Sequence, residues 1–180
     1  MQNYWIKYLI LFSLSLIWGS SFILMKKGLN VYSYYQVASL RLFIAFVFLF
    51  PFCIPALKRV KKKHILPLLI TGIFGNAIPA FLFAKSQTQI DSSIAGVLNS
   101  LTPIFTLIIG VLFFSLRVNK TNVLGVVIGL LALIFLSFNY FDDSNIYNIY
   151  VWYIVLATIC YAISINVIKE CLYELDAVYI

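Results

Sequence analysis

Six long runs of apolar residues, each with few charges inside it, limit most strongly how this chain can fold. Crossing a bilayer core of about 30 Å takes about 20 helical residues. Every backbone polar group inside that core must be bonded within the protein. The runs are continuously apolar and do not alternate, which favours helices over barrel strands. We therefore expect an all-α polytopic membrane protein with helices at residues 4–25, 33–57, 65–84, 92–115, 121–140 and 149–169.

The composition agrees with this fold class and excludes two others. Of the 180 residues, 63% are hydrophobic and 11% are charged, whereas soluble domains have about 45–50% apolar and about 25% charged residues. A disordered chain needs low hydrophobicity, so that class is excluded as well. The three cysteines form no CxxC pair and no cluster with histidine. We therefore expect no disulfide framework, no metal site and no cofactor.

The basic residues predict the orientation of the chain. The net charge is +7, but Lys and Arg stand mainly at the ends of apolar runs, so we expect no nucleic-acid partner. The side that holds the N-terminus and the KRVKKK segment carries nine of them, and the other side carries three. The excess predicts a multi-pass protein of the inner (cytoplasmic) membrane with a cytoplasmic N-terminus. His64, beside the lysine-rich segment, is expected to lie on the surface.

An internal repeat links the two ends of the sequence. Sliding the chain by 143 positions places the end of the first predicted helix over the end of the sixth, with three identities: Ser21/Ser164, Lys26/Lys169 and Leu29/Leu172. Five helices separate the copies, so they cross the membrane in opposite directions, as in the inverted repeats of secondary transporters. We expect residues 1–140 to form a first five-helix repeat. Residues 141–180 are expected to form a loop and the first helix of an incomplete second repeat.

Several segments carry a resemblance to a known family. WGSSFILMKKGL, SLRLF, SSIAGVLNSLTPIFTLIIGVLFF and LGVVIGLLALIFL resemble the first repeat of EamA-type members of the drug/metabolite transporter superfamily. The resemblance implies ten helices in two inverted repeats and the movement of small metabolites, such as amino acids, or of drugs. The family commonly has a glutamate where this chain has Leu116. The chain ends where a seventh helix should begin, so we expect a transporter truncated after the sixth helix.

Four residues inside the predicted helices are candidate substrate ligands: Arg41, Asn99, Asn76 and Trp18. A charged residue within a membrane is costly. Arg41 either lines a cavity for an anionic or zwitterionic substrate, snorkels toward the surface, or pairs with a nearby helix end. Asn99 and Asn76 lie on small or polar helix faces, which suit either a pathway or close helix packing. Trp18 either stacks on a substrate or belongs to the interfacial aromatic belt.

Three further residues are predicted to have structural roles. Pro103 removes a helical hydrogen bond and frees a backbone carbonyl toward a polar cavity. Gly125 and Gly129 form a small-xxx-small pair that permits close helix contact, within the chain or between chains. A homo-oligomer therefore stays open as an alternative to a monomer.

These features together predict a membrane permease and not an enzyme. The sequence has no Ser/His/Asp set, paired carboxylates or HExxH motif, and its acidic residues fall in loops or at helix ends. The expected partners are a small-molecule substrate and the lipid bilayer, and the expected mechanism is alternating access about a midplane cavity. The alternatives are a membrane assembly protein that does not transport and an inactive half-transporter.

Overall fold

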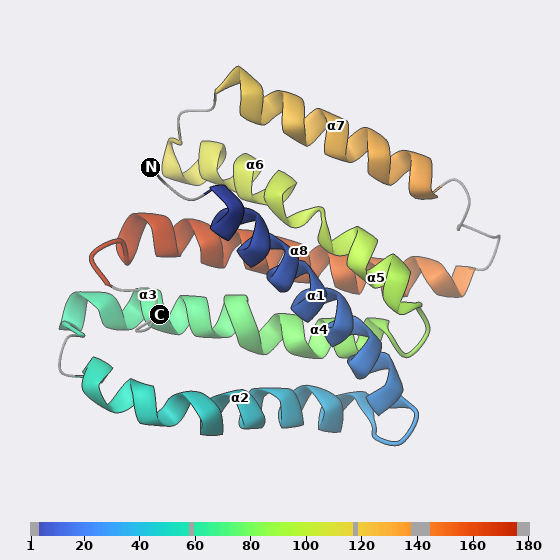
Figure 1. The fold of residues 1–180 in the computed structure, drawn as a ribbon, viewed down its shortest axis with the longest axis horizontal. Coiled ribbons are helices and arrows are strands. Elements are labelled where there is room, and N and C mark those ends of the chain that lie inside the picture. Colours follow the sequence, from blue (N-terminus) through green and yellow to red (C-terminus); the bar gives the residue numbers. More distant parts are fainter. Residues whose placement is uncertain (1–3, 58–59, 117–118, 138–144, 176–180) are drawn as a thin grey trace.

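The computed structural model describes residues 4–57, 60–116, 119–137 and 145–175. Within these residues all regular structure is helical (Figure 1). The elements are α1 (Tyr4–Leu29), α2 (Tyr34–Leu57), α3 (Lys62–Gly72), η1 (Ile73–Ala77), α4 (Ile78–Ser86), α5 (Ser92–Asn99), α6 (Thr102–Phe114), α7 (Lys120–Ser137) and α8 (Asn145–Cys171).

The helices confirm a polytopic membrane fold. Five described stretches are long and apolar enough to cross a membrane: Trp5–Leu29, Tyr34–Ile54, Lys62–Ser86, Ser92–Phe114 and Ile149–Cys171. They correspond to the first four predicted helices and the sixth. The fifth predicted helix is α7, whose described apolar stretch is shorter, Thr121–Leu131. Residues 141–144 and 176–180 of the predicted second unit lie outside the described residues, and so do residues 138–140 at the end of the predicted first repeat. The basic residues Lys58, Arg59 and Arg117 lie outside them as well.

Two of the spans are interrupted near a proline. In the third, η1 is a π-helical turn, in which Ile78 donates its N–H to the carbonyl of Ile73, five residues back. Pro79 follows, and it has no N–H to offer the carbonyl four residues before it. In the fourth span, α5 ends at Asn99 and α6 starts at Thr102, with Pro103 in its first turn. Such interruptions at membrane depth are tolerated where the backbone is buried in protein or lines a cavity.

Helix α8 lies at the centre of the bundle, along α4 and α6 (Figure 1). Its residues Ile154 and Ala157 are fully buried in the main apolar core. Near one end, the Ser86 hydroxyl donates to the carbonyl of Tyr150 at 2.7 Å. The helix that begins the predicted second repeat is therefore packed within the helices of the first.

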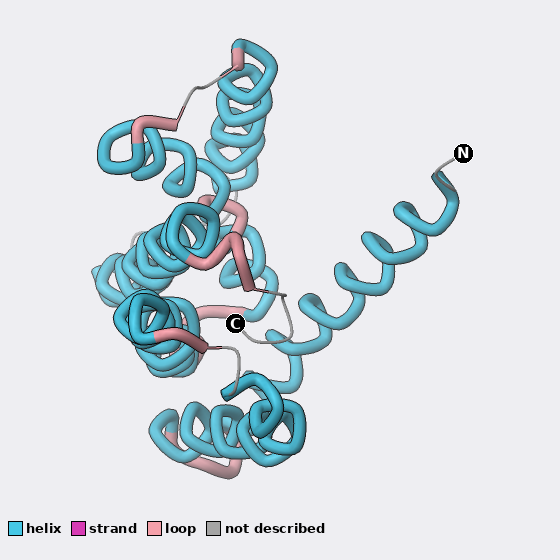
Figure 2. Tube along the Cα trace, turned by 90° about the vertical axis from the view of Figure 1, so that its left-hand side faces the viewer, coloured by secondary structure: helices cyan, strands magenta, loops and turns pink. Residues whose placement is uncertain are grey.

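Helix α1, by contrast, leaves the bundle along most of its length (Figure 2). Near its start Trp5 is 82% exposed, whereas Met25 near its end is 3% exposed. The two related helices run in opposite directions (Figure 1). Helix α1 is thus attached to the bundle at its C-terminal end.

The surface position expected for His64 is wrong, because its side chain is 2% exposed. The turn after α8 covers the start of α3, and Leu172 there is fully buried. His64 Nδ1 accepts the N–H of Lys61 at 3.3 Å. Its Nε2 lies 3.6 Å from the carboxylate of Glu174, which also pairs with Lys63 at 2.7 Å. This cluster joins the end of α8 to the third span.

Candidate substrate cavity

A cavity of about 510 Å³ lies where α1 separates from the bundle. All four residues predicted from the sequence as substrate ligands line it: Trp18, Arg41, Asn76 and Asn99. They come from four different spans, and so tertiary packing alone brings them together. The structure therefore places these four predicted residues around one space.

Repeat-related residues of α1 and α8 line this same cavity. Four pairs separated by 143 positions contribute to its wall: Trp18/Tyr161, Ser21/Ser164, Phe22/Ile165 and Met25/Ile168. Only Ser21/Ser164 has the same residue in both helices. The paired residues therefore correspond in their position at the cavity and mostly differ in residue type. The two helices thus present equivalent faces to the cavity, as an inverted repeat about its centre requires.

Among the described residues, Arg41 is the only charged one that lines the cavity. Its Nη2 donates to the Ser21 hydroxyl at 3.4 Å, and its Nη1 lies 3.7 Å from the sulfur of Met25. Both contacts are long, and both partners are neutral. No ion pair joins Arg41 to an acidic residue within the described part of the chain. The guanidinium therefore keeps strong hydrogen-bond donors for an anionic group.

The break in the fourth span shapes the wall around Asn99. Pro103 cannot donate to the carbonyl of Asn99, four residues before it. The Thr102 hydroxyl replaces the missing N–H and donates to the Asn99 carbonyl at 2.8 Å. The same hydroxyl lies 3.4 Å from the side-chain oxygen of Asn99. The carbonyl that Pro103 frees thus has a local partner.

The π-helical turn carries Asn76 and lies close to α8. A β-carbon on Gly75 would collide with the hydroxyl of Ser164. Gly75 has no β-carbon, which lets α8 approach the turn this closely. Asn76 is exposed and follows Gly75 at the cavity wall. The turn therefore positions a polar side chain at the cavity beside a fixed contact with α8.

Three aromatic rings form an apolar part of the wall. The centroids of Phe22 and Phe83 are 5.5 Å apart, and those of Phe83 and Tyr161 are 6.0 Å apart. Sequence reasoning did not select these residues or Ser164. The repeat offset was the available signal for two of them, because it pairs Trp18 with Tyr161 and Ser21 with Ser164.

A second cavity, of about 570 Å³, adjoins the first. The two share four lining residues: Trp18, Asn99, Thr102 and Ile165. The second cavity extends toward the end of α8, where Lys169 lines it. Leu116 lines it as well. This is the position at which the sequence comparison above expects a glutamate. The two cavities together connect the centre of the bundle with the side on which α8 ends.

The predicted contact at Gly125 and Gly129 is not made within the described residues. No heavy atom lies within 4 Å of a β-carbon built on either glycine. Helix α7 lies at the edge of the bundle (Figure 1). A contact of this face with another chain therefore stays a prediction. The described residues also contain no group of three or more His, Cys, Asp or Glu side chains placed to hold a metal ion.

Five long apolar helical stretches, packed with a cavity between them, define a polytopic helical membrane protein. The model of the EamA-like transporter family matches residues 5–138, and the chain belongs to this family. The predicted family is thus confirmed.

Three relatives are transporters by name. An "Uncharacterized transporter" of Archaeoglobus fulgidus is 32% identical over 143 residues, which cover 79% of this chain and 51% of the relative. The "Uncharacterized inner membrane transporter YedA" of Escherichia coli K12 is 28% identical over 71% of this chain and 42% of its own length. The "Uncharacterized transporter YoaV" of Bacillus subtilis is 28% identical over 69% and 43%. The chain spans about half the length of these curated relatives, and no solved structure matches it.

Proposed function

We propose that this protein is a permease that moves a small solute across the cytoplasmic membrane by alternating access. In this proposal Arg41, Asn99, Asn76 and Trp18 bind the solute in the cavity between α1 and α8. The observation that carries the proposal is that residues of two oppositely directed helices, paired by the 143-residue offset, line one cavity whose wall also holds Arg41, Asn76 and Asn99. In inverted-repeat transporters the substrate lies at such an interface, and the two halves rock about it.

The orientation is proposed from the charges. The segment before α3 is rich in lysine, and α1 starts on that same side of the bundle (Figure 1). The positive-inside rule then puts the N-terminus in the cytoplasm. Placement in the inner membrane agrees with the printed name of the YedA relative.

The cavity wall favours an anionic or zwitterionic solute with an apolar part, such as an amino acid. Within the described part of the chain, the contacts of the Arg41 guanidinium are long and go to neutral groups, so a solute carboxylate would give it a charged partner. The amides of Asn76 and Asn99 can bond further polar groups of the solute. The rings of Phe22, Phe83 and Tyr161 suit an apolar side chain. A cationic drug would meet an unneutralised positive charge.

Solute flux tests this function. The protein reconstituted in lipid vesicles should take up at least one of a panel of labelled amino acids and monocarboxylates faster than empty vesicles do. Arg41→Ala and Asn99→Ala should lose that uptake while both variants still insert in the membrane. Normal uptake by both variants would contradict the site. Absence of uptake across the panel, together with a stable self-assembly, would favour a membrane assembly protein that does not transport.

A further inference from the structure

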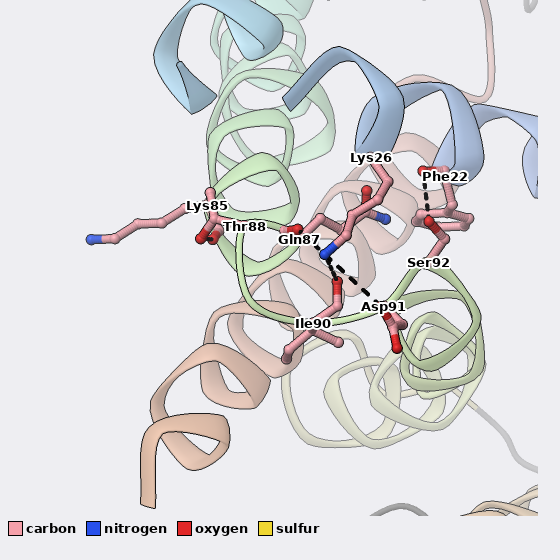
Figure 3. A network of polar contacts seen from close by, with 8 residues as sticks. All are labelled: Phe22, Lys26, Lys85, Gln87, Thr88, Ile90, Asp91 and Ser92. Carbon is pink, nitrogen blue, oxygen red and sulfur yellow. Dashed lines mark hydrogen bonds and ion pairs between the residues drawn. The ribbon is translucent and has the colours of Figure 1, made fainter. Parts of the chain in front are cut away.

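Lys26, near the end of α1, holds that helix to the turn between α4 and α5 (Figure 3). Its ammonium donates to the carbonyls of Gln87 at 2.8 Å and Ile90 at 3.0 Å. The carboxylate of Asp91 lies 4.0 Å away. The carbonyls at the end of a helix carry a partial negative charge, which a cation stabilises. One ammonium thus joins two segments that are about 60 residues apart in the sequence.

A second contact beside Lys26 supports the same attachment. The Ser92 hydroxyl, at the start of α5, donates to the carbonyl of Phe22 at 3.2 Å (Figure 3). Phe22 also packs its ring on Phe83, and both residues line the cavity, as does Met25. The segment of α1 that Lys26 fixes is therefore the segment that covers the cavity on the side where α1 ends.

Toward its start, α1 stands away from the bundle (Figure 2). Phe12 and Trp18, closer to its start, are 65% and 61% exposed. The second cavity, which Trp18 and Lys169 line, leads toward the opposite side. In this structure α1 is thus held at one end of the cavity and stands away from the bundle toward the other.

We propose that Lys26 is a positioning residue of the transport cycle, which keeps the cavity shut on the side where α1 ends. Opening on that side requires the ammonium to leave the two carbonyls. The release is feasible because the Lys26 side chain is 32% exposed and the Asp91 side chain is 77% exposed, so water can replace the lost partners. The inference rests on the proposed function, since it assigns a step of that cycle.

The accessibility of a cysteine in the cavity tests this role without any substrate. Asn76→Cys serves as the only thiol, after Cys53, Cys160 and Cys171 are replaced by serine. A membrane-impermeant thiol reagent is added on the side of the α4–α5 turn. Lys26→Met removes both hydrogen bonds of the ammonium and should raise the reaction rate at least about tenfold, because the loss of a single charge-assisted hydrogen bond already corresponds to that factor. Lys26→Arg, which keeps a cation, should stay near the parent rate.

Lys27→Met is the matched control, because Lys27 is the next residue on α1 and is exposed. It should leave the rate unchanged. Ser92→Ala removes only one hydroxyl and should raise the rate in the same direction, so the test stands even if Lys26→Met does not insert. Equal rates in the parent, Lys26→Met and Ser92→Ala, or an equal rise with Lys27→Met, would overturn the role of Lys26. If the thiol reaction rates change as predicted but no solute flux is found, the role of Lys26 in closing the cavity stands and the proposed transport function is overturned.

Discussion

The side-chain oxygen of Asn166 on α8 lies so close to Gly110 on α6 that a β-carbon on the glycine would come within 2.8 Å of it. The amide nitrogen of the same Asn166 donates to the carbonyl of Thr106 at 3.0 Å. Small residues let helices approach in membranes, and polar side chains then bond between them. These contacts hold α8, the helix of the predicted second repeat, against α6 of the predicted first repeat.

Gly110→Ala should therefore destabilise the protein. The new methyl group would meet both Asn166 and Leu116, and overpacking of this kind costs about 1–3 kcal/mol. Gly125→Ala is the matched control, since nothing lies within 4 Å of its β-carbon position. The melting temperature in detergent should fall for Gly110→Ala and not for Gly125→Ala. An unchanged melting temperature in both variants would contradict the packing of α8 on α6.

Thr102→Val should destabilise the break in the fourth span. The variant keeps the shape of the side chain but leaves the Asn99 carbonyl without the hydroxyl that replaces its helical donor. A lost hydrogen bond of this kind costs about 1 kcal/mol. Thr102→Ser keeps the hydroxyl and should melt close to the parent protein. Equal melting temperatures for the valine and serine variants would show that this bond adds no stability.

The Lys63–Glu174 pair predicts a dependence of stability on pH. The ammonium of Lys63, which bonds Glu174 at 2.7 Å, lowers the pKa of that carboxyl, and Lys61 and His64 act in the same direction. Tyr173 adds a 3.4 Å contact from its hydroxyl. A carboxyl with a lowered pKa stabilises the folded state above its unfolded pKa of about 4.3, and that contribution is lost as the pH falls through the folded value.

Glu174→Gln should therefore lower the melting temperature slightly near neutral pH and have no effect in acid. The effect is small because the pair is exposed to solvent. Glu170→Gln, at an exposed position on the last turn of α8, is the control and should follow the parent at every pH. Melting curves over about pH 3 to about pH 7 measure the difference. A loss that persists unchanged in acid would contradict the role of the carboxylate charge.

Arg41→Gln should weaken the uptake of an anionic solute at least about tenfold, because a charge-assisted bidentate contact would be lost. Arg41→Lys keeps the charge but not the planar fork, and it should retain part of the affinity. The solute concentration for half-maximal uptake measures the change. The same affinity for an anion in the parent and in Arg41→Gln would exclude Arg41 as its partner.

Much of the fold followed from the sequence, because hydropathy over a span of bilayer length leaves few alternatives. The interruptions at Asn76 and Asn99 were harder to predict, since a proline shows that a hydrogen bond is missing but not how the chain responds. One proline lies after a π-helical turn and the other lies in the first turn after a break.

The candidate cavity was only partly predictable from the sequence. Its wall brings together four predicted residues: Trp18, Arg41, Asn76 and Asn99. Periodicity marks polar positions on each helix, whereas their convergence depends on tertiary packing. The burial of His64 was missed for the same reason, because the turn that covers it comes more than 100 residues later in the chain. The 143-residue offset was the more informative signal, and it pairs the two serines that lie at the cavity wall.

The proposed cycle is tested most directly by the two-sided accessibility of a cysteine at Asn99, one of the residues that line both cavities. In a protein with Asn99→Cys as the only thiol, an impermeant reagent is added to one side of sealed vesicles and then, in a separate sample, to the other. Alternating access predicts that the thiol reacts from both sides. Reaction from one side only, over hours and at saturating reagent, would contradict it.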